Sequence, residues 1–411
     1  MVIPRAKISF KYRDIIECIF RLLLPLSYSR GEKIIQEFEN QFALNYEMPP
    51  AVVFNKARMA LYFLLKNLNL KPGGEVLISA IHIADFVNII YWAGFKPVVV
   101  DVDSETYCID YNDLEKKINN NSVLVIITHL SGFVTDMSKI EEISKRRDIP
   151  FVEDCSQAVS SDYRGRKLGT FGVAAIFSLS LMKPVCTLFG GMVISQNKKL
   201  LELLRQEKEK ITFVARFPLL AEGAKHLILK LATQKTIFIL FVFPFLRIFS
   251  APLDFFARYQ RYNKKVIFKE KIPQDYFSKF TWQQAILGLS QLESLAAREE
   301  KKISNAEFLY RRLSGGRNIR KIKLLDGARS SFWTFPVYVE DAANFKKYLA
   351  KYGIDSSGYL LSVLGDEPAF AGFDFVNPVA SDIKKHTLLI SMYSQLTTKE
   401  LEHMISVINS Y

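Results

Sequence analysis

Cysteine is scarce in this 411-residue sequence, and its placement argues against disulfide and zinc sites. The four cysteines are widely spaced and form neither a CxxC pair nor a cluster with histidine; they are Cys18, Cys108, Cys155 and Cys186. Disulfide frameworks and structural zinc sites both show characteristic cysteine spacings. We therefore expect no disulfide framework, no bound metal, and a reducing cytoplasmic compartment.

Long hydrophobic runs are also missing. The most apolar stretch, residues 226–249, contains only 11 uncharged residues between Lys235 and Arg247. A membrane-spanning helix needs about 20 apolar residues, and Pro244 should break this stretch as a helix. In the earlier apolar run 15–26, Glu17 and Arg21 interrupt the pattern and no small-residue cleavage site follows. A signal peptide is therefore not expected.

Phosphate-gripping loops, nucleic-acid-binding motifs, internal repeats and low-complexity tracts are absent as well. What is present is 49% hydrophobic content, which is enough for a large core divided into two or three structural units. The formal net charge is +13, and segment 208–271 alone holds 13 Lys/Arg against 4 Asp/Glu. Most of the positive charge thus comes from one segment.

Strand-like and helical patterns alternate through the first half of the chain. Residues 1–50 should be largely helical. Strands are then expected at 51–54, 75–78, 96–101, 123–127 and 151–153, with helices at 57–67, 85–92, 111–118 and 138–147. This rhythm predicts an α/β fold with a mostly parallel sheet covered on both faces. We expect a large domain at 1–200, a basic, aromatic-rich insertion at 201–273, and a helical region with a small α+β domain at 274–411.

Three chemically useful side chains follow two of the apolar runs. Asp154 ends the first run, Ser178 ends the run that starts at residue 173, and Lys183 comes shortly before a Gly-Gly pair. Open α/β sheets bind ligands at the carboxyl ends of their strands. An acid, a hydroxyl and a lysine at that edge suit pyridoxal phosphate, whose ring nitrogen takes an acidic partner and whose aldehyde takes an amine. The alternatives are a surface lysine and an acid that binds magnesium or caps a helix.

The same stretch resembles the DegT/DnrJ-type sugar aminotransferases. Five consecutive motifs carry the resemblance: Val152-Glu-Asp-Cys-Ser-Gln-Ala158, Gly165-Arg-Lys-Leu-Gly-Thr-Phe-Gly172, Phe177-Ser178, Lys183 and Gly190-Gly-Met192. The resemblance implies the aspartate-aminotransferase (type I) fold and pyridoxal phosphate as the cofactor. It also implies transfer of an amino group from an amino acid, L-glutamate, to a keto sugar linked to a nucleotide.

Within this resemblance, each motif residue has an expected role. Lys183 would form the Schiff base with the cofactor and shuttle the α-proton, and Asp154 would keep the ring nitrogen protonated. Gln157 would lie near the ring and its phenolic oxygen, and Ser178 would bind the phosphate. Ordinary hydrogen bonding within turns is the alternative for these last two residues.

The start of the helix at 57–67 should complete the cofactor site. Free backbone N–H groups at Ala57 and Arg58 favour an anion, and the Arg58 side chain could add a bidentate contact to the phosphate. His82 falls near the position where the family places a planar residue over the ring, with a structural role at a helix start as the alternative.

The resemblance departs from the family at Phe277-Ser278-Lys279. The family has Asn-Tyr-Arg there, and its asparagine reaches the phosphate of the neighbouring subunit. Lys279 could substitute for this contact, and the family resemblance implies a homodimer.

The segment 213–265 combines aliphatic and phenylalanine runs with basic residues. Such a composition suits burial in the interface of an anionic membrane, where each basic residue contributes about 1 kcal/mol. We expect a peripheral protein at the cytoplasmic face of the membrane, with stretch 15–26 joining the same surface. The acceptor would be nucleotide- or lipid-linked and serve surface-glycan or lipid biosynthesis. Packing on the body of the protein or on a second subunit is the alternative, and nucleic acid is not an expected partner.

Two other functions stay open. Some relatives in the family dehydrate sugars, although these typically carry histidine at the position of Lys183. A non-catalytic family member could instead act as a membrane-bound regulator or scaffold, and it would not bind pyridoxal phosphate.

Overall fold

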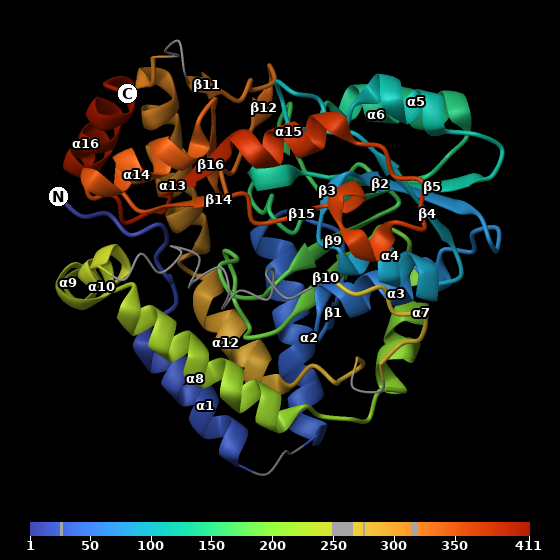
Figure 1. Ribbon diagram of the computed structural model, residues 1–411. Coiled ribbons are helices and arrows are strands. Elements are labelled where there is room, and N and C mark those ends of the chain that lie inside the picture. Colours follow the sequence, from blue (N-terminus) through green and yellow to red (C-terminus); the bar gives the residue numbers. More distant parts are fainter. Residues whose placement is uncertain (25–27, 249–265, 274–275, 315–318) are drawn as a thin grey trace.

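A seven-stranded sheet lies at the centre of the protein (Figure 1). The computed structural model describes residues 1–24, 28–248, 266–273, 276–314 and 319–411. In spatial order the strands are β1 (Ala51–Phe54), β10 (Gly191–Ile194), β9 (Ala174–Ser178), β6 (Phe151–Asp154), β5 (Ser122–Thr128), β2 (Glu75–Ser79) and β4 (Lys96–Val100). β10 runs antiparallel to both of its neighbours, β1 and β9, and the other strand pairs of this sheet are parallel.

Both faces of this sheet are covered by helices, because its strands are apolar on both sides. Leu124 and Ile126 contribute to one core, whereas Val125 and Ile127 contribute to the other. The first core is covered by α3 (Ala57–Asn67), α4 (Asp85–Trp92) and α7 (Lys198–Glu209), and the second by α2 (Tyr28–Asn45), α5 (Tyr111–Lys117), α6 (Met137–Arg147) and α12 (Trp282–Leu292). The predicted α/β fold with a mostly parallel, doubly covered sheet is confirmed.

A smaller antiparallel sheet follows toward the C-terminus, in the order β11 (Ile319–Lys321), β13 (Phe335–Val339), β16 (Thr387–Ile390) and β14 (Ser356–Gly358). Its helices are α13 (Leu295–Arg312), α14 (Ala342–Lys351), α15 (Pro378–His386) and α16 (Thr398–Asn409). The buried Asp101 at the end of β4 accepts hydrogen bonds from the backbone N–H groups of Val379 and Ala380, at 3.0 and 2.9 Å. These bonds hold the start of α15 against the large sheet.

Short strands connect the part of the chain around the large sheet with the part around the smaller sheet. A three-stranded sheet contains β7 (Asp162–Tyr163), β8 (Arg166–Lys167) and β12 (Ala328–Arg329), and β3 (Ile81–His82) pairs with β15 (Ser362–Val363). Single 3-10 turns lie at Leu130–Gly132, Leu364–Asp366 and Pro368–Phe370. The first ten residues are not helical, contrary to the prediction. Ile3 instead pairs with the backbone beside β14, and Arg5 binds Asp355, so this segment takes its conformation from contacts about 350 residues away.

A helical pair packs against the outer side of α12 and runs along one edge of the protein (Figure 1). It consists of α1 (Tyr12–Leu23) and α8 (Arg216–Ala232), and it is followed by α9 (Lys235–Ile237), a π-helical turn (Phe238–Val242) and α10 (Phe243–Ile248). Residues 249–265 of the basic segment lie outside the described residues.

Pro244 does not break the helix, contrary to the prediction. The π-helical turn directly before it changes the hydrogen-bond spacing, and such bulges accommodate a residue that cannot donate a backbone bond. No single described helix is long and apolar enough to cross a membrane, whereas α8 together with Lys235–Phe245, bent by 71°, meets that test by length and composition.

Candidate active site

Two adjacent strands of the large sheet end with polar side chains at the same edge. Asp154 is the last residue of β6 and Ser178 the last residue of β9, and these parallel strands pair directly, with Asp154 opposite Ile176. Both side chains are buried. The strand register therefore brings the acid and the hydroxyl to one corner, as the sequence predicts.

The Asp154 carboxylate is held ionised in the interior. Burial by itself would raise its pKa, but the adjacent His82 ring and the hydrogen bonds of Ser156 hold the pKa below the ordinary value. Oδ2 lies 3.2 Å from His82 Nε2, and Oδ1 accepts the backbone N–H of Ser156 at 2.9 Å. An ionised carboxylate at this position can bind a protonated ring nitrogen.

His82 lies beside this carboxylate. Its Nδ1 accepts the backbone N–H of Ile83 at 2.8 Å, so the neutral imidazole carries its proton on Nε2, the atom that faces Asp154. That Nε2 has no hydrogen bond of good geometry in the described part of the chain, although the two atoms are close. The other side of the ring lies against Phe86, with a centroid distance of 3.8 Å. The described contacts of His82 are thus with the acid and with α4, and its stacking on a cofactor ring stays a prediction.

Lys183 is an amine removed from water. It follows Met182, whose φ of 69° turns the chain, and its side chain is only 6% exposed. Loss of solvation lowers its pKa to about 7; the nearby Asp154 opposes this shift and the nearby Lys302 reinforces it. The neutral, nucleophilic form of this amine is therefore accessible near neutral pH.

Trp333 is the closest aromatic neighbour of this amine, with Lys183 Nζ 3.8 Å from the ring centroid. Such a contact favours the charged ammonium by about 0.5–2 kcal/mol. The lowered pKa corresponds to about 5 kcal/mol in the other direction, so desolvation outweighs the aromatic ring. Trp333 itself is fixed by a 2.8 Å hydrogen bond from Nε1 to the carbonyl of Met182.

A close approach of backbone segments connects Ser178 to the start of α3. Gly191 lies opposite Ser178 in the β9–β10 pair, and a Cβ on Gly191 would come within 2.2 Å of the backbone N and Cα of Ala57. No side chain caps the first turn of α3, which begins at Ala57. The positive end of this helix therefore lies beside the Ser178 strand, as an anion-binding corner requires.

Two side chains that were predicted to contact the phosphate and the ring of the cofactor have partners within the protein. The Arg58 side chain forms an ion pair with Asp85 in the first turn of α4. Gln157 Oε1 accepts the backbone N–H of Ser131 at 2.6 Å, and Nε2 of Gln157 has no hydrogen bond among the described residues. Gln157 thus has one amide group that could face a ligand, whereas the Arg58 guanidinium is already occupied.

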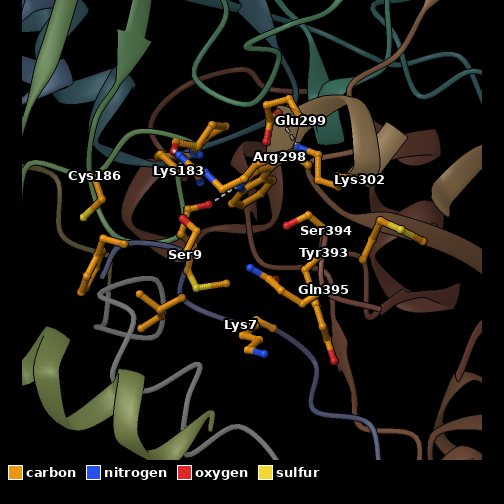
Figure 2. Close-up of a pocket in the computed structure, with 17 residues that line it drawn as sticks. Lys7, Ser9, Lys183, Cys186, Arg298, Glu299, Lys302, Tyr393, Ser394 and Gln395 are labelled. Carbon is orange, nitrogen blue, oxygen red and sulfur yellow. Dashed lines mark hydrogen bonds and ion pairs between the residues drawn. The ribbon is translucent and has the colours of Figure 1, made fainter. Parts of the chain in front are cut away.

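Lys183 lines an open cavity (Figure 2). Its empty volume is about 640 Å³ including the mouth. Residues 6–10 of the N-terminal segment border it on one side, and α13 borders it on another through Arg298, Glu299 and Lys302. Arg298 donates to the carbonyl of Pro184 at 3.2 Å, and Lys302 pairs with Glu299 at 2.6 Å. No motif in the sequence indicated α13 or Trp333 as neighbours of the lysine, because nothing local relates them to it.

A buried group of potential metal ligands lies one residue from Asp154. Ligand atoms of His129, Glu153 and Cys155 lie within 4.8 Å of one another. The Glu153 oxygens, however, accept three backbone N–H groups, from Gly169, Phe171 and Gly172, at 2.7–2.9 Å. Glu153 therefore holds the glycine-rich turn in place, which explains structurally why two of the sequence motifs occur together.

The departure at 277–279 has a structural counterpart. The Phe277 ring packs on Tyr62 and Phe63 of the same chain, and Lys279 pairs with Glu32 at 3.2 Å. Ser278 hydrogen-bonds the buried Asn55 at 2.6 Å. These residues are engaged within their own chain, so the described contacts give no support to Lys279 as a substitute for the asparagine.

Comparison with known families identifies the regions that are shared. The family model described as the DegT/DnrJ/EryC1/StrS aminotransferase family matches residues 21–212 and 256–409. The unmatched residues 213–255 contain α8, α9 and α10.

Curated relatives match over part of their length. A GDP-perosamine synthase of Escherichia coli O157:H7 is 36% identical over 166 residues, which is 40% of this chain and 46% of the relative. The spore coat polysaccharide biosynthesis protein SpsC of Bacillus subtilis is 32% identical over 177 residues, which is 43% of this chain and 45% of that protein. The chain thus spans about half the length of the curated relatives it matches.

Solved structures match over the whole chain. The sugar aminotransferase CalS13 of Micromonospora echinospora superposes with a TM-score of 0.76 at 21% identity, covering 100% of both chains. The aminotransferase PseC of Helicobacter pylori gives 0.73 at 18% identity, covering 100% of this chain and 99% of its own. This likeness confirms the type I aminotransferase fold.

Proposed function

Since the chain belongs to the DegT/DnrJ/EryC1/StrS aminotransferase family of pyridoxal-phosphate enzymes, we propose that it transfers an amino group from an amino acid to a keto sugar. The observation that supports this most strongly is Lys183, a buried amine whose pKa is lowered to about 7 beside an ionised buried acid. A lysine kept for structure alone would gain nothing from such burial.

The residues at the sheet edge fit the cofactor that the family uses. Asp154 would hold the ring nitrogen, and Gln157 would donate to the phenolic oxygen from its unbonded Nε2. Ser178 and the first backbone N–H groups of α3, at Ala57 and Arg58, would hold the phosphate. When bound, the cofactor supplies an electron sink that makes the α-proton of the donor removable.

Lys183 then carries the proton. Because its pKa lies near 7, it can take a proton from the α-carbon of the donor and return a proton to the carbon that becomes the amine-bearing carbon of the sugar. Its burial keeps water from competing for these transfers. Asp154 stays charged throughout, since His82 and Ser156 hold its pKa low.

The substrates and the setting are further parts of the proposal. Relatives named GDP-perosamine synthase and spore coat polysaccharide biosynthesis protein support a nucleotide-linked keto sugar in glycan synthesis, with L-glutamate as the donor that the family resemblance implies. A homodimer follows from the same resemblance. The basic, apolar composition of segment 213–265 supports a peripheral location at the cytoplasmic face of the membrane, with a lipid-linked acceptor as the alternative.

The test begins with the cofactor. The purified protein incubated with pyridoxal phosphate should show the visible absorbance of the lysine-bound cofactor, and Lys183→Ala should abolish it. Lys7→Ala is the matched control, because Lys7 borders the same cavity without belonging to the proposed cofactor site. Adding L-glutamate should convert the absorbance to that of the aminated cofactor, and a panel of nucleotide-linked keto sugars should restore it. A wild-type protein that binds no pyridoxal phosphate would refute the proposed function.

A further inference from the structure

The pair formed by α1 and α8 is tied together at both ends. The Arg216 side chain at the start of α8 donates to the carbonyls of Leu22 and Leu24 at the end of α1. At the opposite end, the Tyr12 hydroxyl donates to the carbonyl of Lys230 at 3.4 Å. The two helices therefore run antiparallel and side by side along the edge of the protein (Figure 1).

The inner sides of the pair form a compact core beneath it. Leu219 and Leu229 of α8 are buried with Ile15 and Leu22 of α1. Gly223 permits the closest approach, because a Cβ there would lie 2.8 Å from Ile19. The same core includes residues 186, 188 and 189 of the loop that follows Lys183. The pair thus rests directly on the loop that carries the lysine.

The outer side of the pair, which we call the α1–α8 face, is apolar. Every exposed residue of α8 lacks a polar side chain: Phe217, Pro218, Ala221, Ala224, Ile228 and Leu231. Phe217 is 84% exposed and Ile228 is 64% exposed. On α1, Ile16, Phe20 and Leu23 are 52–62% exposed. A helix that faces only water normally presents charged and polar residues on that side, so this face is built to be covered.

The charge around the α1–α8 face indicates which kind of partner can cover it. Residues 11–24 and 213–245 contain seven Lys/Arg and three Asp/Glu. Three of the seven basic residues are in ion pairs, Arg21 with Glu17, Lys225 with Glu222 and Lys235 with Glu400. The remaining basic residues outnumber the one remaining acid, Asp14, so the pair of helices keeps a net positive charge. A second copy of this face would bring the same positive charge toward itself, which disfavours self-association. An anionic lipid surface offers both an apolar interior and negative charge.

We propose that the α1–α8 face docks in the interfacial layer of an anionic membrane. Residues 213–255, which include α8, lie outside the match to the family model, so the sequence of this surface is not among the features that the family shares. The inference rests on the proposed function in one respect: it brings the Lys183 loop close to the bilayer, where a keto sugar on a lipid carrier would be presented.

The contacts of α8 also extend to the mouth of the lysine cavity. Lys230 Nζ donates to the carbonyl of Ile8 at 3.2 Å, and the buried His226 ring stacks on Phe10 with centroids 6.1 Å apart. Both partners belong to residues 6–10, which border that cavity. A docked α8 would therefore orient the cavity relative to the membrane surface.

Sedimentation with vesicles tests the docking. The full-length protein should bind vesicles of phosphatidylcholine and phosphatidylglycerol but not vesicles of phosphatidylcholine alone, and added salt should weaken binding. The double variant Phe217→Ser/Ile228→Ser should bind about 100-fold more weakly, because it removes two large side chains from the buried area. The matched control is Leu44→Ser/Val376→Ser, whose side chains are 72% and 62% exposed elsewhere on the protein.

Three results would overturn the inference: equal binding to neutral vesicles, equal loss of binding in both double variants, or oligomers that only Phe217→Ser/Ile228→Ser disperses. The last result would show that a second copy covers the face. Protein in cell membranes should be released by high salt at alkaline pH; retention until detergent is added would indicate insertion across the bilayer instead of docking. The absorbance of bound pyridoxal phosphate should be the same in all variants, so a failure of docking is distinguishable from a failure of the proposed enzyme.

Discussion

Replacing Lys183 with methionine should stabilise the protein in the absence of cofactor. In the unfolded chain this lysine has the ordinary pKa of 10.5, whereas burial lowers the pKa to about 7 in the folded state. Folding at pH 7 must therefore remove protons that the unfolded chain keeps. From these two pKa values, the cost is about 4 kcal/mol at pH 7. Methionine has a similar length and no charge, so it escapes this cost.

The pH dependence identifies the cause. The penalty is present in full below pH 7 and disappears as the pH rises to 10.5, because the unfolded chain then loses the same proton. At pH 9 the remaining cost is about 2 kcal/mol. For a chain of this size, the melting temperature of Lys183→Met should exceed that of the wild type by about 5 °C at pH 7 and by about 2 °C at pH 9.

Differential scanning calorimetry of both proteins, after removal of pyridoxal phosphate, provides the measurement. Lys385→Met is the matched control, since this lysine is exposed at the end of α15 and its replacement should change the melting temperature little at either pH. A gain from Lys183→Met that is equal at pH 7 and pH 9 would mean that packing, and not charge, is responsible. A loss of stability would refute the buried neutral amine altogether.

Two further substitutions test the framework around the site. Arg5→Ala should lower the free energy of unfolding in urea by about 3 kcal/mol, because it removes the guanidinium that binds the 2% exposed Asp355 at 2.7 and 2.8 Å and leaves this carboxylate only the backbone N–H of residue 5 at 3.4 Å. Adding Asp355→Ala should restore part of the loss, and no recovery would contradict the pairing argument. Gly191→Ala should lower the free energy of unfolding by about 2 kcal/mol, because the new Cβ would force β10 away from Ala57. The same displacement should weaken the binding of pyridoxal phosphate. Unchanged affinity in a cofactor titration would show that this contact does not support the phosphate site.

The large sheet was predictable from sequence because its signals are local. Runs of four to seven apolar residues followed by helical periodicity placed most strands to within two residues, and the helix predicted at 57–67 coincides with α3. The first ten residues were not predictable in the same way. Their extended conformation depends on Asp355 and on the backbone beside it, and no pattern within residues 1–50 contains that information.

In the candidate site, too, the residues with local sequence signals were predictable and the contacts between distant segments were not. Asp154 and Ser178 were found because each ends a strand, and the parallel register then places them together. Arg58 and His82 have neighbours that the sequence did not indicate, since Asp85 and Asp154 compete for their side chains only in the folded protein. The neighbours that tune Lys183, Trp333 and Lys302, lie more than 100 residues away and belong to no shared motif.

The insertion shows how composition and structure contribute separately to a prediction of membrane binding. By composition, all the apolar residues of α8 count toward the membrane, but half of the helix is already used in packing on α1. Three large side chains remain exposed, Phe217, Ile228 and Leu231. At about 1.5–3 kcal/mol each, they supply on the order of 6 kcal/mol before the cost of association is subtracted. Phe217 and Ile228 supply most of this α8 contribution, which is why replacing only these two side chains should weaken binding about 100-fold.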